Sequence, residues 1–196
     1  MFEKHKLINL PKQPYVLYTA KIYSKKHIYV DVRNFLSHND IFIQLVYDKY
    51  FSKTKNPVVA VKQVFKFVRE KIEYVKDKGE CWQYAYETAQ LKQGDCEDCA
   101  ILFAQLLIQS KTIPTENIFI VHADWHAFNV IKIHSILYVV DVINDIDLIE
   151  LDDYYQRFRP NINFIFSRYE VWGQSKVFKI KLQDHDPSEE ALNKDL

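Results

Sequence analysis

The chain has 196 residues, of which 48% are hydrophobic and 15% aromatic, enough for one domain with a buried core, with or without a small appendage. Lysine plus arginine equals aspartate plus glutamate at 26 each, so the zero formal charge gives no reason to expect a nucleic acid or a membrane surface as partner. With 3 glycines, the chain also has no glycine-rich loop of the kind that binds phosphate.

The compartment is predicted from the signals that the sequence lacks. The first residues contain no apolar run of the kind found in secretory signals, and no stretch approaches 18 uninterrupted apolar residues. The cysteines Cys81, Cys96 and Cys99 are too few, and odd in number, for a disulfide framework. We therefore expect a cytoplasmic protein in a reducing environment.

Strands and then a helix are predicted near the beginning of the chain. Segments 15–23 and 27–32 are rich in β-branched and aromatic residues, which is typical of strands. Ser37 and Asp40 resemble a capping box, and we expect a helix over 41–51 behind it.

A second helix has a sharper start signal. Asn56 followed by Pro57 is typical of an N-cap and the first helical position. Apolar residues then recur at helical spacing, which predicts a helix that runs to about Tyr74 and stops before Gly79.

A third helix is predicted to begin at Cys96. Gly94 and Asp95 form a tight entry in which Asp95 is a suitable N-cap. The apolar residues that follow have the spacing of one buried helix face: Cys96, Cys99, Ala100, Phe103, Ala104 and Leu107. Cys96 is therefore expected in the first turn of a buried helix.

After Pro114 the apolar period changes to that of β structure. Five segments are predicted as strands: 118–121, 128–133, 137–142, 164–169 and 177–182. Helices followed by a run of strands indicate an α+β fold. We divide the chain into three parts: N-terminal strands and a helix packed on the core (1–55), the core itself (56–183) and a polar tail (184–196).

Cys96 is the candidate nucleophile. A thiol reacts as the thiolate, and a helix N-terminus lowers its pKa and offers N–H groups to an oxyanion. An imidazole must move the proton and a third polar group must orient it, and His126 and Asp141 lie on successive strands of one predicted hairpin. A cysteine on an apolar helix face is, by itself, more often a small core residue, so the argument depends on the combination.

Three motifs resemble those of transglutaminase-like cysteine enzymes. GDCEDCA at 94–100 is similar to their nucleophile motif at the start of a helix, although Cys99 replaces the usual aromatic residue. HAFNV at 126–130 resembles their histidine strand, and YVVD at 138–141 resembles the strand whose aspartate orients the histidine. Trp82-Gln83 and Glu87-Thr88, upstream of the cysteine, are similar to the bacterial transglutaminase-like cysteine proteinases.

The resemblance implies a papain-like α+β fold, with the nucleophile helix packed on an antiparallel sheet and the transglutaminase-like catalytic core over 56–183. It implies Cys96 as nucleophile, His126 as general acid and base, and Asp141 as the orienting group. The expected reaction is hydrolysis of a peptide or amide bond in a peptide or protein substrate, through a thioester and without a cofactor. Two features depart from the family: the hairpin lacks its usual glycine, and Val142 stands where proline often follows the aspartate.

Further residues are candidates for the substrate cleft. By the same resemblance, Trp82 and Gln83 would line the cleft or donate to the oxyanion, with core packing an equal alternative for Trp82. Asp124 and Asn129 would contact substrate or support Asp141, with ordinary loop and strand positions as the alternative.

The two acids that flank the cysteine have further candidate roles. Asp95 is a candidate for the oxyanion or substrate cleft besides its capping role. In some bacterial relatives the equivalent acids help to bind calcium, so Asp95 and Glu97 are a minor calcium candidate here.

Three other functions stay open. Cys96, Cys99, His122 and His126 have the ligand types and local spacings of a structural zinc site. A protein that keeps the fold without activity would be a binding module. If the protein is an enzyme and a lysine amine accepts the acyl group in place of water, the protein is a cross-linking transglutaminase.

Overall fold

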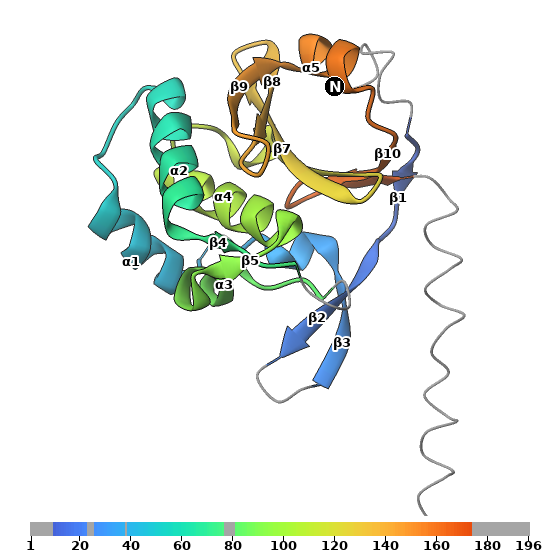
Figure 1. Ribbon diagram of the computed structural model, residues 1–196, viewed down its shortest axis with the longest axis horizontal. Helices are drawn as coiled ribbons and strands as arrows, with labels where there is room; N and C mark the ends of the chain where they lie inside the picture. Colours follow the sequence, from blue (N-terminus) through green and yellow to red (C-terminus); the bar gives the residue numbers. More distant parts are fainter. Residues whose placement is uncertain (1–9, 23–25, 38, 77–80, 174–196) are drawn as a thin grey trace, which may run out of the picture.

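The computed structural model describes residues 10–22, 26–37, 39–76 and 81–173, which form an α+β fold. Helices α1 to α4 lie on one side of an antiparallel sheet and helix α5 lies at its far end (Figure 1). The helices are Ile41–Tyr50 (α1), Pro57–Lys71 (α2), Ala85–Leu91 (α3), Cys96–Ser110 (α4) and Leu151–Phe158 (α5), and there are 3-10 turns at Val32–Phe35 and Thr115–Asn117.

Within the described ranges, seven strands form the main sheet in the order β1-β11-β10-β6-β7-β8-β9, and each neighbouring pair is antiparallel. These strands are Lys12–Gln13 (β1), Ile118–Ala123 (β6), His126–Ile133 (β7), Ile136–Asp141 (β8), Ile146–Glu150 (β9), Ile162–Phe166 (β10) and Val171–Gly173 (β11). Two small sheets pair Leu17–Ile22 (β2) with Lys26–Asp31 (β3), and Glu73–Tyr74 (β4) with Gln93–Gly94 (β5).

The main sheet has a hydrophobic core on each face. Successive side chains of a strand point to opposite faces. In β6, Ile118 and Ile120 therefore join the core shared with the helices, whereas Phe119 and Val121 join a second core with residues of α5. Because both faces are covered, β6 reads in the sequence as an almost continuous apolar run.

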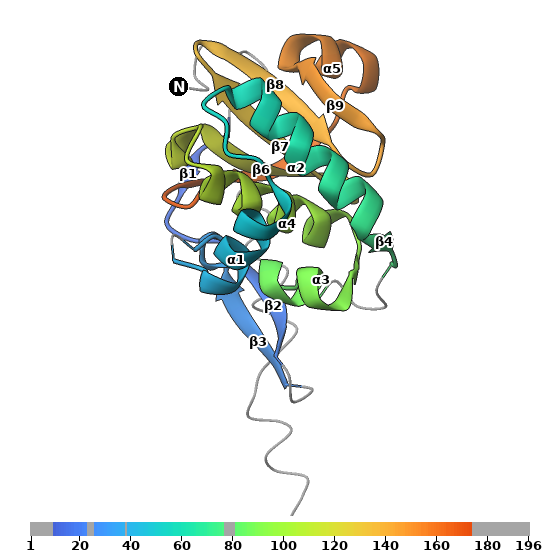
Figure 2. The ribbon, with the colours of Figure 1, turned by 90° about the vertical axis from the view of Figure 1, so that its left-hand side faces the viewer.

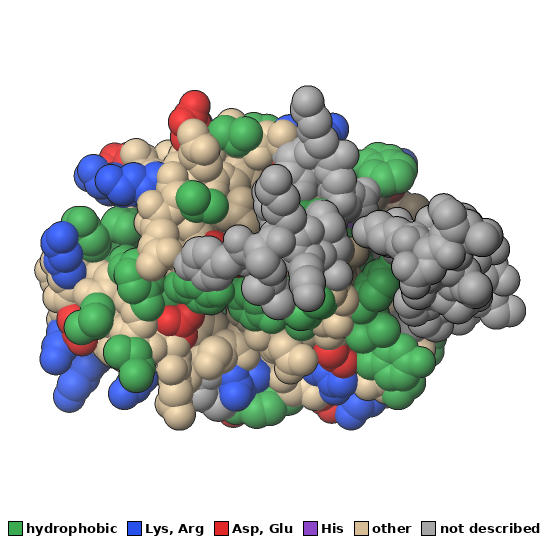
Figure 3. Space-filling view, turned by 90° about the horizontal axis from the view of Figure 1, so that it is seen from below, with side chains coloured by type: hydrophobic (Ala, Val, Ile, Leu, Met, Phe, Trp, Pro, Cys, Tyr) green, Lys and Arg blue, Asp and Glu red, His purple; other side chains and the backbone are tan. Residues whose placement is uncertain are grey.

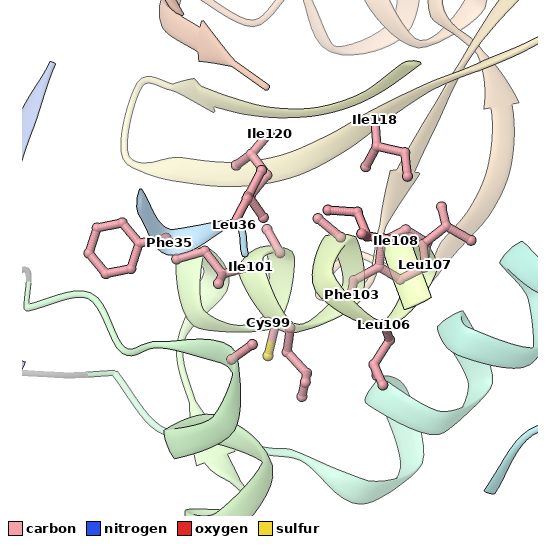
Figure 4. Packing of buried hydrophobic residues seen from close by; sticks show 14 of the residues in the cluster. Phe35, Leu36, Cys99, Ile101, Phe103, Leu106, Leu107, Ile108, Ile118 and Ile120 are labelled. Atoms are coloured by element: carbon pink, nitrogen blue, oxygen red, sulfur yellow. The ribbon is translucent and has the colours of Figure 1, made fainter. Parts of the chain in front are cut away.

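Helix α4 is the centre of the helical layer. It packs on β6 and β7 on one side and on α1, α2 and α3 on the other, and Figure 2 shows it behind those three helices. Its residues from Glu97 to Gln109 are all buried, so burial extends around the helix beyond the predicted apolar face. Figure 4 shows this packing, with β6 residues above the helix and Cys99 pointing to the side of α3.

Two of the predicted helices are confirmed with changes at their ends. Asp40, and not Ser37, caps α1, since its side chain accepts a hydrogen bond from the N–H of Ile43 at 3.0 Å. Helix α2 begins after Asn56 as predicted but ends at Lys71, three residues earlier than expected.

The early end of α2 is explained by a strand pairing. The N–H of Glu73 donates to the carbonyl of Lys92 at 2.8 Å, and the N–H of Val75 donates to the carbonyl of Gly94 at 2.9 Å. The resulting parallel pair of β4 and β5 places Tyr74 beside the segment that leads into α4.

The strands predicted over 118–121, 128–133 and 137–142 are confirmed as β6, β7 and β8. Strand β10 ends at Phe166, earlier than predicted, because a tight turn follows in which the N–H of Ser167 donates to the carbonyl of Glu170 at 2.8 Å. Helices α3 and α5 and strand β9 were not predicted. The strand expected over 177–182 and the tail over 184–196 lie outside the described residues.

The N-terminal part contacts the rest of the protein at several places. Strand β1 pairs with β11 in the main sheet, α1 packs on α4, and Ala20 forms a bridge with Trp82. A domain division after residue 55 stays a prediction. Among the described helices, none is long and apolar enough to cross a membrane. On the face shown in Figure 3, side chains of both charges are interspersed, which agrees with the zero net charge.

Candidate active site

Cys96 is the first residue of α4, as the sequence predicts. Asp95 is the N-cap, and its backbone N–H donates to Oδ2 of Asp98 at 3.3 Å. Gly94 permits this close packing, because a Cβ there would lie 2.7 Å from the Cβ of Asp98 and 3.2 Å from Cγ2 of Thr88. The turn before the cysteine is therefore held tightly against the helix that it starts.

The sulfur of Cys96 lies against the beginning of β7. The thiol donates to Oε2 of Glu97 at 3.1 Å, and Sγ is 4.0 Å from the carbonyl oxygen of Trp125. A hydrogen bond from the backbone N–H of Ala127 acts to lower the pKa of the thiol. Since Trp125 and Ala127 flank His126, the sulfur contacts the backbone on both sides of the candidate base.

His126 begins β7 and Asp141 ends β8, so the hairpin brings the two together at one end of paired strands. Nε2 of His126 is 2.8 Å from Oδ2 of Asp141, whose side chain is fully buried. Burial alone would raise the pKa of Asp141, but the hydrogen bond and charge of His126 and the hydrogen bonds from Asn144 outweigh it and lower the pKa. Asp141 is therefore a carboxylate that fixes the imidazole and leaves Nδ1 for another partner.

Two residues absent from the sequence prediction complete this group. Nδ2 of Asn144 donates to Oδ2 of Asp141 at 2.8 Å and lies 3.2 Å from Nε2 of His126, and its backbone N–H donates to Oδ1 of Asp141 at 3.1 Å. The hydroxyl of Tyr154, on α5, donates to Oδ2 of Asp141 at 3.3 Å. The spacing of Asn144 three residues after an aspartate is a turn signal that could have found it, whereas Tyr154 has no local signal.

The thiol and the imidazole are held by different partners. In residues 81–173, which contain the whole candidate triad, no hydrogen bond joins Cys96 to His126. The thiol is bonded to Glu97, and the imidazole is bonded to Asp141 with the side chain of Asn144 in contact with it. The resting site thus consists of two hydrogen-bonded groups that meet at the start of β7.

The charges around the thiol oppose the effect expected from a helix N-terminus. Burial raises the pKa of Cys96, and so do the charge and hydrogen bond of Glu97 and the charge of Asp95. The pKa of Glu97 is itself raised to about 8, by burial first and then by the charge of Asp95 and the hydrogen bond between the two acids. The predicted lowering of the thiol pKa is therefore wrong for the resting protein, and Asp95 is a buried neighbour and not a cleft residue.

Trp82 is 1% exposed and packs among aromatic rings, with centroids 4.3 Å from Tyr18 and 5.4 Å from Phe35. The prediction that it lines the cleft is wrong, and the packing alternative holds. Gln83 is partly buried next to the nucleophile turn, where its backbone N–H donates to Oδ1 of Asp98 at 2.7 Å. Its role as an oxyanion donor stays a prediction.

Asn129 is buried and links the sheet to helix α4. Its Nδ2 donates to the carbonyl of Ala100 at 3.1 Å. The predicted contact with substrate or with Asp141 is therefore wrong. Because Asn129 follows His126 by three residues and Ala100 follows Cys96 by four, this bond fixes β7 relative to the first turn of α4.

Asp124 is exposed in the turn between β6 and β7, where its φ is 50°. Its Oδ2 accepts a hydrogen bond from the backbone N–H of Asn161 at 3.1 Å. Asp124 therefore anchors the turn and does not support Asp141.

The four residues of the alternative zinc site do not converge. The ring of His122 stacks on Phe164 with centroids 4.9 Å apart, and Cys99 points away from the sheet (Figure 4). The described residues include no group of three or more His, Cys, Asp or Glu side chains that could hold a metal ion. The zinc hypothesis is wrong for the described residues, because Cys99 points away from the sheet that carries His122 and His126.

A surface depression of about 530 Å³ adjoins the histidine side of the site. Asn144 both lines the depression and contacts His126 and Asp141. The other lining residues come from the turn after β8, from β9 and from α5: Asp145, Ile146, Asp147, Ile149, Arg157 and Phe158.

Comparison with known proteins agrees with the fold. A family model described as a transglutaminase-like domain matches residues 43–171. The structure of Legionella pneumophila LapG is 18% identical, with a TM-score of 0.53, 70% of this chain and 90% of that chain being covered. The calcium-bound form of LapG is 18% identical, with a TM-score of 0.51, 67% of this chain and 85% of that chain being covered.

The EGTA-treated form of LapG is 17% identical, with a TM-score of 0.53, 68% of this chain and 84% of that chain being covered. No curated protein matches the chain in sequence. At these identities the likeness to LapG shows the fold alone. It agrees with the predicted papain-like α+β arrangement, in which the nucleophile helix packs on an antiparallel sheet.

Proposed function

The chain belongs to the transglutaminase-like domain family, and on that premise we propose that it is a cysteine-dependent enzyme that hydrolyses a peptide or amide bond. One observation carries the proposal: the sulfur of Cys96 lies against the backbone that flanks His126, whose imidazole is fixed by Asp141. The name of LapG gives no substrate, and the peptide or protein substrate proposed here follows from the motifs of the sequence.

The proton of the thiol must move during the attack, because the thiol is neutral at rest. Asp141 holds the Nε2–H of His126, so Nδ1 is the nitrogen that takes this proton. Sγ of Cys96 then bonds to the carbonyl carbon of the substrate's scissile amide. The C–N bond of that amide breaks as His126 returns the proton to the leaving amine. The product of this step is a thioester, and His126 next takes a proton from water, which attacks the thioester and releases a carboxylic acid and the thiol.

The developing oxyanion needs hydrogen-bond donors next to the sulfur. The backbone N–H of Cys96 is at the start of α4, where helical N–H groups have no partner within the helix. Gln83 is the second proposed donor, through its side-chain amide. Asp98 accepts a hydrogen bond from the backbone N–H of Gln83 and so holds this residue beside the turn that leads to Cys96. Asp98 is thus proposed to position this donor without touching substrate.

Alkylation with iodoacetamide, followed by mass spectrometry of each cysteine peptide, tests the proposal. In the wild type near neutral pH, Cys96 should react faster than Cys81 despite its raised pKa, because His126 takes the thiol proton during attack on the reagent, and His126→Ala should remove most of that advantage. The matched control is His134→Asn, which changes an exposed histidine of the turn between β7 and β8 at a position where φ is 56° and asparagine is tolerated. Equal labelling of Cys96 and Cys81 in the wild type would reject the enzyme.

A non-catalytic binding module is the second candidate, and the raised pKa of Cys96 favours it. The same alkylation experiment separates the two functions, since a module needs no reactive thiol. Cross-linking is separated from hydrolysis by the acceptor: incorporation of a fluorescent primary amine into a glutamine peptide would mark a transglutaminase. We expect release of the free acid in its place.

Calcium is proposed only as a minor possibility. Ca²⁺ takes six to eight oxygen ligands, and Asp95 and Glu97 are two buried carboxyls joined by a hydrogen bond. Any further ligands would have to be carbonyl or water oxygens, so we derive no step through the ion. The alkylation rate of Cys96 with added calcium and with EGTA checks this point.

A further inference from the structure

Trp125 is the most exposed of the large hydrophobic side chains in the described part of the protein, at 86%. It immediately precedes His126, and its carbonyl oxygen lies 4.0 Å from the sulfur of Cys96. Trp82, by contrast, is 1% exposed. An exposed tryptophan at the nucleophile offers a large, flat apolar surface where a substrate must bind.

The turn that carries Trp125 is anchored on both sides of Asp124. The N–H of Asp124 donates to the carbonyl of Asn161 at 2.9 Å, and Nδ2 of Asn163 donates to the carbonyl of Asp124 at 3.1 Å. The N–H of Asn161 donates to Oδ2 of Asp124 at 3.1 Å. Three hydrogen bonds therefore fix the backbone next to the tryptophan, so the ring is presented by a rigid turn, and little order has to be gained on binding.

A second exposed surface approaches the cysteine from the helical side. Tyr74 is 50% exposed and Val75 is 42% exposed, and β4 pairs with the strand that leads to Cys96. The pKa of Tyr74 is raised by burial and then by the charges of Cys96, Asp95 and Glu97, as expected for a hydroxyl close to that group. Exposed apolar residues thus lie close to Cys96 in two separate segments, the turn before β7 and strand β4 with the residue after it.

We propose that Trp125 is a specificity-determining residue that stacks on a large apolar or aromatic side chain of the peptide, at a position next to the scissile bond. This inference rests on the proposed function, since the substrate is taken to be the peptide cleaved at Cys96. Stacking on the ring should favour aromatic over small residues at that position by about tenfold, the scale of one buried aromatic contact.

A mixture of synthetic peptides with all residue pairs tests the proposal, with cleavage sites read by mass spectrometry. The wild type should cleave next to aromatic or large apolar residues about tenfold more often than next to alanine. Trp125→Ala should reduce this ratio to near one, and Trp125→Phe should restore most of it. Tyr169→Ala, which removes an exposed aromatic ring from the turn between β10 and β11, is the matched control and should keep the ratio.

Binding is measured separately from cleavage with immobilised Cys96→Ala and Cys96→Ala/Trp125→Ala proteins and the same peptide mixture. The single variant should retain aromatic peptides about tenfold better than the double variant does. If retention depends on Trp125 and the wild type cleaves nothing, the proposed function fails and the binding surface stands. If both variants retain the same peptides, or if Trp125→Ala keeps the cleavage preference, the inference is wrong.

Discussion

The two halves of the candidate site are prepared to different degrees. On the sheet side, His126 and Asp141 share a hydrogen bond of 2.8 Å, and Asn144 and Tyr154 supply further donors to a carboxylate with a lowered pKa. On the helix side, the thiol of Cys96 donates to Glu97 and has a raised pKa. The candidate base is thus held by a fixed carboxylate, whereas burial and then the neighbouring acids Glu97 and Asp95 keep the candidate nucleophile neutral, and activation has to begin on the helix side.

The largest expected effect comes from removal of the base. His126→Ala should lower kcat/KM for a cleaved peptide by about 10² to 10⁴, the range typical of a lost general acid and base. Because the fully buried Asp141 loses its imidazole partner, we also expect a loss of stability, measured by urea unfolding, and activity is compared where the variant is folded. A variant that retains full activity would remove His126 from the mechanism.

The two halves of the site also differ in how well the sequence predicts them. The order of Cys96, His126 and Asp141 follows from a helix start and a two-strand hairpin, which are local patterns. The state of the thiol does not follow, because it depends first on the burial of Cys96 itself and then on the neighbouring acids Glu97 and Asp95 as α4 packs. Asn129 was misread for the same reason, since its partner, the carbonyl of Ala100, is distant in sequence.

The secondary structure, too, could be predicted from the sequence only where its pattern is local and long. Long segments with a regular apolar period, such as α2, α4 and the strands from β6 to β8, were predicted. The 7-residue helix α3 and the 8-residue helix α5 are too short to show a clear period. The end of α2 was missed because the pairing of Tyr74 with Gly94 joins residues 20 positions apart, which no local pattern encodes.

The second effect concerns stability on the sheet side. Asp141→Ala should lower the free energy of unfolding by about 2 to 4 kcal/mol, since it leaves His126, Asn144 and Tyr154 without their shared acceptor in a buried site. Urea unfolding at pH 7 measures this loss. Asp145→Asn, at an exposed position of the following turn where φ is 59° and asparagine is tolerated, should change the stability by less than about 0.5 kcal/mol. Equal effects of the two substitutions would show that the carboxylate is not a structural centre.

The third prediction concerns the acid beside the thiol. The pKa of Glu97 is raised to about 8, so above that pH the wild type gains a negative charge next to Cys96 that Glu97→Gln lacks. At pH 9 the variant thiol should therefore have the lower pKa and react with iodoacetamide faster, by about tenfold for each unit of pKa difference. Below pH 8 the two rates should converge.

Stability provides an independent check of Glu97. The unfolded carboxyl ionises above about 4.5, whereas the folded one stays protonated up to about 8, so wild-type stability falls as the pH rises between these values. Glu97→Gln should escape this loss and become more stable than the wild type across that window. Glu116→Gln, at an exposed acid, is the control. A difference independent of pH would mean that the pKa of Glu97 is not raised.

The smallest effect is expected where the two halves are joined. Asn129→Ala removes the bond from Nδ2 to the carbonyl of Ala100 and should cost about 1 to 2 kcal/mol of stability. Since β7 is then less firmly held against α4, kcat should fall while KM changes little. A variant that loses stability but keeps the wild-type kcat would limit Asn129 to a structural role.

Trapping the thioester is the most direct test of the central claim that a neutral Cys96 is activated by His126 during attack. Wild-type protein mixed with an activated peptide ester and quenched in acid should carry the acyl group on the Cys96 peptide, as read by mass spectrometry, and His126→Ala should carry little or none. An acyl group found only on Cys81, or found on Cys96 to the same extent in both proteins, would contradict the account.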